Sequence, residues 1–164
     1  MPSSVTSYPP LPAPPSGRFD GARHLFPVRI YFEDTDLSGV VYHANYLRYM
    51  ERARSDMLRL AGIDQRATMA AGEGAWAVTA LAIRYASPAR LDDELIVESH
   101  VRAVRGASVD IAQGVRRGDT VLTQADVTAA FVSPDGRARR QPAGWAERFR
   151  TIMTGDFNPV DTPL

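Results

Sequence analysis

Cysteine and lysine are both absent from this chain of 164 residues. Without cysteine the protein can form neither a disulfide nor a thiolate nucleophile, and cysteine-ligated metal sites are excluded. Without lysine, all 19 basic residues are arginine, and they balance 19 acidic residues to a formal net charge of zero. Non-specific nucleic-acid binding depends on a surplus of positive charge, so we expect no nucleic-acid partner.

Long apolar runs are missing as well. No stretch approaches the roughly 20 apolar residues that a membrane-spanning helix needs. The N-terminus shows no basic region followed by an apolar segment, as a secretory signal would. We therefore expect a cytoplasmic protein without a membrane span. The hydrophobic content of 45% still suffices for a buried core, and the length fits one domain.

Proline is concentrated at the N-terminus, where residues 1–22 hold six of the 12 prolines and hardly any bulky apolar residues. Such a segment cannot bury enough surface to offset the entropy lost on ordering. We predict a disordered tail over residues 1–22, an ordered domain over 23–153 and a C-terminal tail over 154–164.

One long helix is predicted from about His43 to Leu60, because apolar residues recur there at spacings of three and four. The apolar stripe consists of Tyr46, Tyr49, Met50, Ala53, Met57 and Leu60. The remaining helix surface carries Arg48, Arg52, Ser55, Asp56 and Arg59. Gly62 is placed to end the helix.

Strands are predicted on both sides of this helix. Apolar and polar residues alternate over residues 26–32, 76–85, 94–104, 109–115 and 121–132, and a short amphipathic helix follows at 144–153. The strands after the helix are joined mostly by tight turns, which favours an antiparallel sheet. The long helix must bury its apolar stripe. The predicted fold is therefore α+β, a five-stranded antiparallel sheet wrapped around one helix.

The loop Asp34-Thr-Asp36-Leu-Ser-Gly39 carries the first candidate chemistry. Its order of residues copies the opening of a calcium-binding EF-hand loop. That loop requires a bidentate glutamate at its twelfth position, where this chain has Asn45. We therefore expect no metal site here.

A catalytic role for this loop is the other interpretation. Free backbone N–H groups in a first helical turn carry partial positive charge and can hold an oxyanion. A carboxylate beside such donors is the minimum that thioester hydrolysis needs. Asp36 can also simply cap the turn or the helix, as aspartate often does. Spacing alone leaves both roles open.

Two segments form a specific pattern, Val28-Arg-Ile-Tyr-Phe-Glu-Asp-Thr-Asp-Leu-Ser-Gly-Val-Val-Tyr-His-Ala-Asn-Tyr46 and Tyr49-Met-Glu-Arg-Ala-Arg54. They resemble the 4-hydroxybenzoyl-CoA thioesterase family of hotdog proteins, and within it the Tol–Pal-associated YbgC-type acyl-CoA thioesterases. Tyr85-Ala-Ser-Pro-Ala-Arg-Leu-Asp-Asp93 and Arg105-Gly-Ala-Ser108 are also similar to that subgroup. The resemblance covers about residues 26–132, and the proline-rich tail departs from the compact members.

The resemblance implies that Asp36 is the catalytic carboxylate, acting as nucleophile or as general base. It also implies that the backbone N–H of His43 polarises the thioester oxygen; the His43 ring is either an acid or structural. Glu51 is the rival carboxylate, because a distinct hotdog subgroup draws its carboxylate from the long helix; otherwise Glu51 pairs with a neighbouring arginine. The expected substrate-binding residues are Gly39, Val41, Tyr42, Asn45 and Arg105, although Asn45 could instead bond the adjacent loop.

The resemblance further implies hydrolysis of an acyl-CoA, or of an acyl-carrier-protein thioester, by a homodimer or homotetramer. Coenzyme A belongs to the substrate, and no cofactor is implied. Arg105 and the cluster Arg137-Ala-Arg-Arg140 are candidate phosphate ligands. The alternatives are a hotdog hydratase or dehydratase and a non-catalytic acyl-CoA-binding protein.

Overall fold

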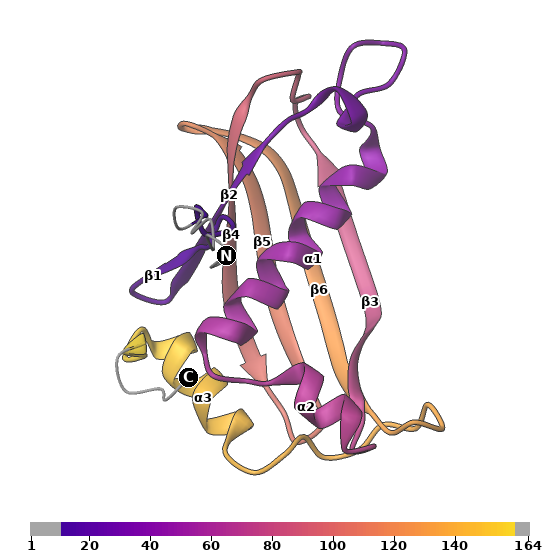
Figure 1. The fold of residues 1–164 in the computed structure, drawn as a ribbon, viewed down its shortest axis with the longest axis vertical. Coiled ribbons are helices and arrows are strands. Elements are labelled where there is room, and N and C mark those ends of the chain that lie inside the picture. Colours follow the sequence, from indigo (N-terminus) through magenta and orange to yellow (C-terminus); the bar gives the residue numbers. More distant parts are fainter. Residues whose placement is uncertain (1–10, 160–164) are drawn as a thin grey trace, which may run out of the picture.

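A computed structural model describes residues 11–159. Within these residues six strands form one antiparallel sheet in the order β1-β2-β4-β5-β6-β3 (Figure 1). Their bounds are β1 Arg18–Asp20, β2 Arg23–Arg29, β3 Ala75–Tyr85, β4 Glu94–Val104, β5 Ser108–Arg117 and β6 Thr120–Val132. The helices are α1 His43–Leu60, α2 Gln65–Ala70 and α3 Trp145–Thr154, with a 3-10 turn at Phe32–Asp34.

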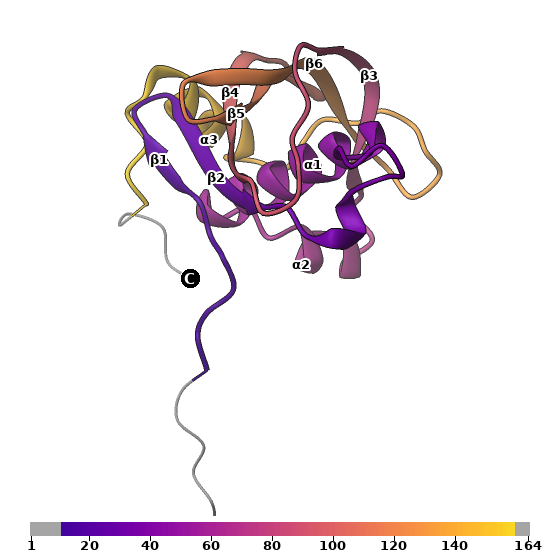
Figure 2. The same cartoon turned by 90° about the horizontal axis from the view of Figure 1, so that it is seen from above.

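The long helix α1 lies against one face of the sheet, which curves around it (Figures 1 and 2). Its bounds agree with the predicted helix, and its apolar stripe forms the core: Met50, Ala53 and Met57 are fully buried. The α+β hotdog architecture is thus confirmed. Leu60, predicted in the stripe, is only half-buried, and Leu58 is buried instead.

The core divides into two clusters along α1. One lies under the first half of the helix and includes Ile30, Tyr46 and Val97. The other lies under its second half and includes Met57, Phe131 and Phe149. The aromatic residues of α3 close this second cluster, so α3 seals the end of the molecule farthest from the loop before α1 (Figure 1).

The sheet has one strand more than the five we predicted. The extra strand β1 pairs with β2 in a short hairpin, with Phe19 opposite His24. The predicted tail of residues 1–22 therefore ends too late, because part of it belongs to the sheet. Residues 1–10 and 160–164 lie outside the described part. At the other end Phe157, in the predicted C-terminal tail, packs against Phe19 with ring centroids 4.8 Å apart.

The first predicted strand is also displaced toward the N-terminus. Residues 26–32 were expected to be extended, whereas β2 ends at Arg29 and a 3-10 turn occupies Phe32–Asp34. The turn forms because Asp34 Oδ2 accepts a hydrogen bond of 2.8 Å from the Tyr31 N–H. This turn carries the chain away from the sheet and into the loop before α1.

Asp56 was expected on the outer surface of α1, but it is buried with 8% of its surface exposed. The N-terminal segment covers it. Asp56 accepts hydrogen bonds from Ser16 Oγ at 3.0 Å, Gly17 N–H at 2.8 Å, His24 Nε2 at 2.9 Å and Arg59 Nη2 at 2.7 Å. This carboxylate therefore joins the N-terminal segment and β2 to α1.

Candidate active site

The loop before α1 is folded around Asp36. The Gly39 N–H donates to the Asp36 carbonyl at 3.0 Å, and the Asp36 N–H donates to the Val40 carbonyl at 2.9 Å. Gly39 has a φ of +76° with no atom near the position of a Cβ. It is therefore needed for the left-handed backbone of the turn rather than for space.

The carboxylate of Asp36 is exposed at the tip of this turn. Its Oδ1 accepts hydrogen bonds from the Ser38 N–H at 2.8 Å and the Ser38 hydroxyl at 2.5 Å. Both bonds favour the ionised form and hold the pKa of Asp36 below its usual value. Among the described residues Oδ2 has no hydrogen-bond partner, so one oxygen supports the turn and the other is free to act on a ligand.

The first turn of α1 follows directly. Tyr42 occupies the N-cap position, and its side chain makes no capping hydrogen bond to the helix. The first turn contains no acidic residue. The N–H of His43, the first helical residue, lacks an intrahelical acceptor. It also has no other partner within residues 11–159. A partial positive charge is therefore available beside the Asp36 turn.

Buried contacts fix the position of this helix end. Asn45 Nδ2 donates to the Asp34 carbonyl at 2.9 Å. The Asn45 side chain therefore bonds the adjacent loop, which was the alternative to contacting substrate. Val41 is buried, and its N–H donates to the Ala89 carbonyl at 2.9 Å. The Ala89 N–H in turn donates to the Tyr46 hydroxyl at 2.8 Å.

Two residues beside the site were not predicted from the sequence. The Tyr85 hydroxyl donates to the His43 carbonyl at 3.0 Å and so ties the end of β3 to the start of α1. Arg90 pairs through its backbone with Val40 in an isolated bridge. Both lie in the segment Tyr85–Asp93, whose resemblance to the thioesterase subgroup was the available signal.

Glu51 lies two turns farther along α1 than His43, a rise of about 12 Å. Its carboxylate pairs with Arg54, and its side chain is 60% exposed. Arg54 is itself buried and also donates to Gln113 Oε1 at 2.5 Å. Glu51 thus has an arginine partner, as expected for a structural role, and within one subunit it lies away from Asp36.

The arginines expected to bind phosphates lie elsewhere. Arg105 follows β4 at the end opposite the Asp36 loop, and pairs with Asp110 at 2.7 Å. Arg137 contacts Asp135 at 3.4 Å, and Arg139 donates to the Glu73 carbonyl at 2.5 Å. The structure brings none of these to Asp36 within the same subunit.

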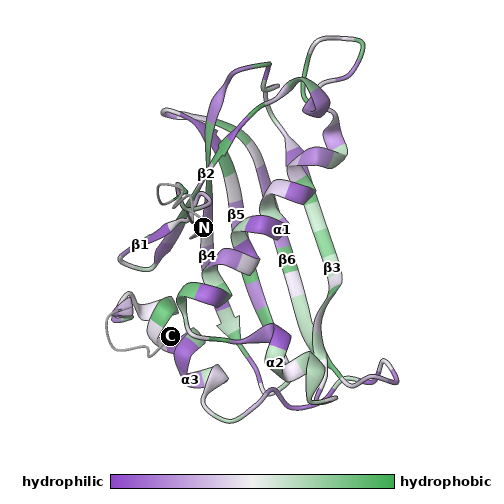
Figure 3. Cartoon of the chain, in the orientation of Figure 1, coloured by the Kyte–Doolittle hydropathy of each residue, from purple (hydrophilic) through white to green (hydrophobic). Residues whose placement is uncertain are grey.

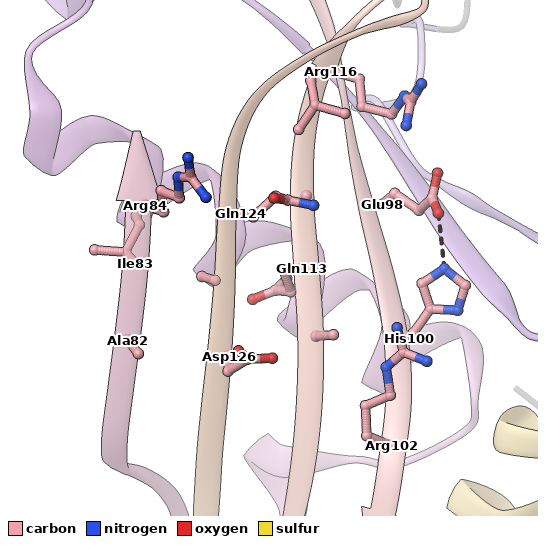
Figure 4. Close-up of a pocket in the computed structure, with 14 residues that line it drawn as sticks. Ala82, Ile83, Arg84, Glu98, His100, Arg102, Gln113, Arg116, Gln124 and Asp126 are labelled. Carbon is pink, nitrogen blue, oxygen red and sulfur yellow. Dashed lines mark hydrogen bonds and ion pairs between the residues drawn. The ribbon is translucent and has the colours of Figure 1, made fainter. Parts of the chain in front are cut away.

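A polar groove of about 480 Å³ lies on the sheet face turned away from α1. Figure 4 shows Arg84, Arg102 and Arg116 around it, with His100 Nε2 donating to Glu98 at 2.8 Å. Asp36 and His43 are not among its lining residues. The groove therefore does not contain the candidate catalytic pair.

A smaller pocket of about 60 Å³ lies between α1 and β3. We call it the α1–β3 pocket. Most of its lining is apolar, and its residues are Glu51, Arg54, Ser55, Met57, Leu58, Gln65, Trp76, Ala77, Val78, Val109, Ile111, Ala129 and Phe149.

Residues 11–159 contain no group of three or more histidine, aspartate or glutamate side chains placed to hold a metal ion. Over the same range no helix is long and apolar enough to cross a membrane.

An antiparallel sheet curved around one long helix, with an exposed carboxylate beside the N-terminus of that helix, defines a hotdog-fold protein. The chain belongs to the thioesterase superfamily, whose family model matches residues 38–124. The match begins at Ser38, two residues after Asp36, so it supports the family and not the catalytic residue.

Similar proteins agree with this family. The acyl-CoA thioesterase YbgC of Haemophilus influenzae is 45% identical over 107 residues, covering 65% of this chain and 79% of that protein. The acyl-CoA thioester hydrolase YbgC of Escherichia coli is 42% identical over 110 residues, covering 66% and 81%. A probable thioesterase from Bartonella henselae superposes with a TM-score of 0.69 at 36% identity, covering 73% of this chain and 99% of the other. The resemblance to YbgC-type proteins is therefore confirmed.

Proposed function

We propose that this protein hydrolyses acyl-CoA thioesters to a free acid and coenzyme A. The names of the YbgC relatives support this activity. The observation that carries it is that, among residues 11–159, neither Asp36 Oδ2 nor the His43 N–H has a hydrogen-bond partner, and the two groups stand seven residues apart in one turn and the helix start that follows it. One group is suited to attack or to activate water, and the other to receive the negative charge that develops on the carbonyl oxygen.

Two routes use these groups. As a nucleophile, Asp36 attacks the carbonyl carbon and expels the thiolate, which takes a proton from water; a second water then opens the mixed anhydride. As a general base, Asp36 removes a proton from the water that attacks the thioester directly. Asp36 is ionised at neutral pH like an ordinary aspartate, as both routes require, and its lowered pKa acts in the same direction.

The substrate-binding part of the proposal covers the loop and the helix start. Gly39, Val41 and Tyr42 form the backbone path between Asp36 and His43. Asn45 supports this path through Asp34. No observation on this chain supports Arg105 as a phosphate ligand of the same subunit.

The active unit in this proposal is a dimer formed through β3. This strand is one of the two outer strands of the sheet, the other being the short β1, and Figure 3 shows it coloured largely hydrophobic along its length. Val78 is 47% exposed, Leu81 39% and Tyr85 43%. A long apolar edge strand invites pairing with another chain. Pairing with a second copy about a twofold axis covers both edges at once.

Finer features remain part of the proposal. The resemblance implies a tetramer built from two dimers and an acyl-carrier-protein thioester as a further substrate. A cytoplasmic location is expected from the sequence, and catalysis without a cofactor is again implied by the resemblance. Each of these four features has its own test. Light scattering tests the tetramer, assays on acyl-carrier-protein thioesters test the substrate, cell fractionation tests the location, and activity after dialysis against a chelator tests catalysis without a metal cofactor.

The decisive experiment compares two carboxylate variants. Asp36→Asn keeps an oxygen that accepts from Ser38, so the turn should fold as before, while hydrolysis should fall by about a hundredfold or more. Glu51→Gln is the matched control, with the same loss of one charge, and should retain most of the activity. Free-thiol release from an acyl-CoA panel measures both. Full turnover by Asp36→Asn together with loss in Glu51→Gln would move the catalytic carboxylate to α1.

A further inference from the structure

Tyr85, the last residue of β3, contacts the first residue of α1 through its side chain. Its hydroxyl donates a hydrogen bond of 3.0 Å to the His43 carbonyl. The Tyr85 ring meets the His43 ring edge-on with centroids 6.3 Å apart, and the Tyr46 ring edge-on with centroids 5.7 Å apart. These ring contacts hold the hydroxyl in place, so the bond is a fixed part of the helix start.

The chain around this bond is attached to α1 by other groups. The Val41 N–H donates to the Ala89 carbonyl at 2.9 Å, and the Ala89 N–H donates to the Tyr46 hydroxyl at 2.8 Å. Both bonds remain when the Tyr85 hydroxyl is removed. The distinct effect of that hydroxyl must therefore lie in the peptide group that it contacts.

The acceptor belongs to the peptide group between His43 and Ala44. In a planar peptide the carbonyl oxygen and the N–H of the next residue share delocalised electrons. A hydrogen bond to the oxygen draws electron density away from the nitrogen and makes the N–H a stronger donor. The donor that Tyr85 strengthens is therefore the Ala44 N–H, and the same bond fixes the plane in which this N–H points.

The Ala44 N–H is available to a ligand. Like the His43 N–H, it has no hydrogen-bond acceptor among residues 11–159. The following N–H, that of Asn45, is occupied because it donates to the Tyr42 carbonyl at 2.9 Å. Ala44 is only half-buried. The start of α1 thus presents two adjacent free N–H groups, and both point out of the helix end that follows the Asp36 turn.

The Tyr85 hydroxyl also carries the proton that this role needs. A tyrosine hydroxyl is protonated at neutral pH, and burial raises the pKa of Tyr85 further. Only the protonated form donates to a carbonyl. The bond to His43 therefore persists over the whole range in which Asp36 is ionised and the thioester is stable enough to assay.

We propose that the negative charge on the thioester oxygen is held by two N–H groups, those of His43 and Ala44, and that Tyr85 is the positioning residue that orients and polarises the second. This inference rests on the proposed function and adds one donor and one supporting side chain to it. Tyr85 touches no reacting atom. Because the charge on the oxygen is larger in the transition state than in the bound thioester, Tyr85 acts on kcat rather than on KM.

Tyr85→Phe tests this role, because it keeps the ring and removes only the hydroxyl. Loss of a whole oxyanion donor typically costs a factor of about a hundred or more in kcat. The Ala44 N–H stays in place but is weakened, so kcat should fall by about 3- to 30-fold, with KM within about twofold of wild type. Free-thiol release from an acyl-CoA that the wild type hydrolyses gives both constants, and circular dichroism checks the fold.

Thr123→Val is the matched control. Thr123 of β6 is paired in register with Tyr85. Its hydroxyl is buried, and among the described residues it has no hydrogen-bond partner. The substitution therefore removes a hydroxyl beside the same strand position without breaking a hydrogen bond, and kcat and KM should both stay within about twofold of wild type.

The stretching frequency of a bound thioester carbonyl gives a readout that altered packing alone would not move. Asp36→Asn is mixed with an acyl-CoA whose thioester carbonyl is isotope-labelled, and the difference infrared spectrum is recorded. Hydrogen bonds to the oxygen weaken the C=O bond and lower its frequency. The double variant Asp36→Asn/Tyr85→Phe should therefore absorb at a higher frequency than Asp36→Asn, whereas Asp36→Asn/Thr123→Val should match Asp36→Asn.

The outcomes separate this inference from the proposed function. The inference is wrong if folded Tyr85→Phe keeps the wild-type kcat, if only its KM rises, or if the double variant with Tyr85→Phe shows no shift in frequency. The proposed function stands in each of these cases, provided that the wild type hydrolyses acyl-CoA and Asp36→Asn does not. A wild type without hydrolysis, or Asp36→Asn with full turnover, would overturn the proposed function and the inference with it.

Discussion

Replacing Gly17 by alanine tests how firmly the N-terminal segment is attached to the domain. A Cβ at this position would lie 2.4 Å from the Leu25 carbonyl oxygen, 2.6 Å from His24 Nε2 and 2.8 Å from Asp56 Oδ2. Real Cβ atoms do not approach heavy atoms so closely, and the Leu25 carbonyl belongs to the β2 backbone. The segment must therefore move away, and it takes the Ser16 and Gly17 hydrogen bonds to Asp56 with it.

The magnitude follows from these two bonds. A hydrogen bond to a charged group contributes about 1.5–3 kcal/mol. Water that enters after the segment leaves will replace part of this, so we expect a loss of roughly 2–4 kcal/mol in the free energy of unfolding. For a domain of this size the melting temperature should fall by about 5–15 °C.

Urea and thermal unfolding at pH 7 are the assays, and Gly106→Ala is the control. Gly106 has no atom within 4 Å of a built Cβ and no positive φ, so this substitution should be neutral or stabilise by up to about 1 kcal/mol. The reasoning is refuted if Gly17→Ala unfolds within about 0.5 kcal/mol of wild type, the range expected for an unconstrained surface position.

Three further predictions concern the same segment, pH and the edge strand. Deleting residues 1–15 should leave the melting temperature unchanged, because residues 11–15 are exposed. Deleting residues 1–20 also removes Ser16, Gly17 and β1, and should lower the melting temperature as Gly17→Ala does. Equal melting temperatures for the two deletion variants would contradict this. Burial lowers the pKa of His24 below 6.5, against the opposing bond to Asp56. The folded state thus binds this proton less readily than the unfolded state, and stability should fall as pH drops below about 6.5 toward the lowered pKa; His24→Gln should lose this slope in pH-dependent urea titrations. Leu81→Arg on the exposed edge of β3 should give a monomer in light scattering with little thioesterase activity, and a fully active monomer would refute the proposed dimeric active unit.

The sequence was sufficient for elements defined by local periodicity. The predicted helix at 43–60 and the strand at 94–104 agree with α1 and β4 to the residue. Each has a regular apolar period and a clear end signal, so neither needs tertiary information. Strand β1 was missed because three residues with a single apolar side chain, Phe19, give no period, and only pairing with β2 defines it.

The same distinction between local and long-range contacts applies to the candidate site. Asp36, Gly39 and His43 adjoin one another in sequence, so a turn followed by a helix start was enough to bring them together. The bond from Tyr85 to His43 and the burial of Asp56 by Ser16 depend on contacts between residues about 40 positions apart. Such contacts arise from closure of the sheet around α1, which no local pattern encodes.

If β3 joins two subunits and the start of α1 holds the thioester, as proposed, the Tyr85–His43 hydrogen bond couples substrate affinity to self-association. It connects the strand proposed to join two subunits with the helix end proposed to hold the thioester. If the second subunit makes the free energy of substrate binding more favourable, bound substrate makes the free energy of subunit association more favourable by the same amount. A non-hydrolysable acyl-CoA analogue should therefore lower the dimer dissociation constant, and protein diluted below that constant should show a raised KM before it loses its fold.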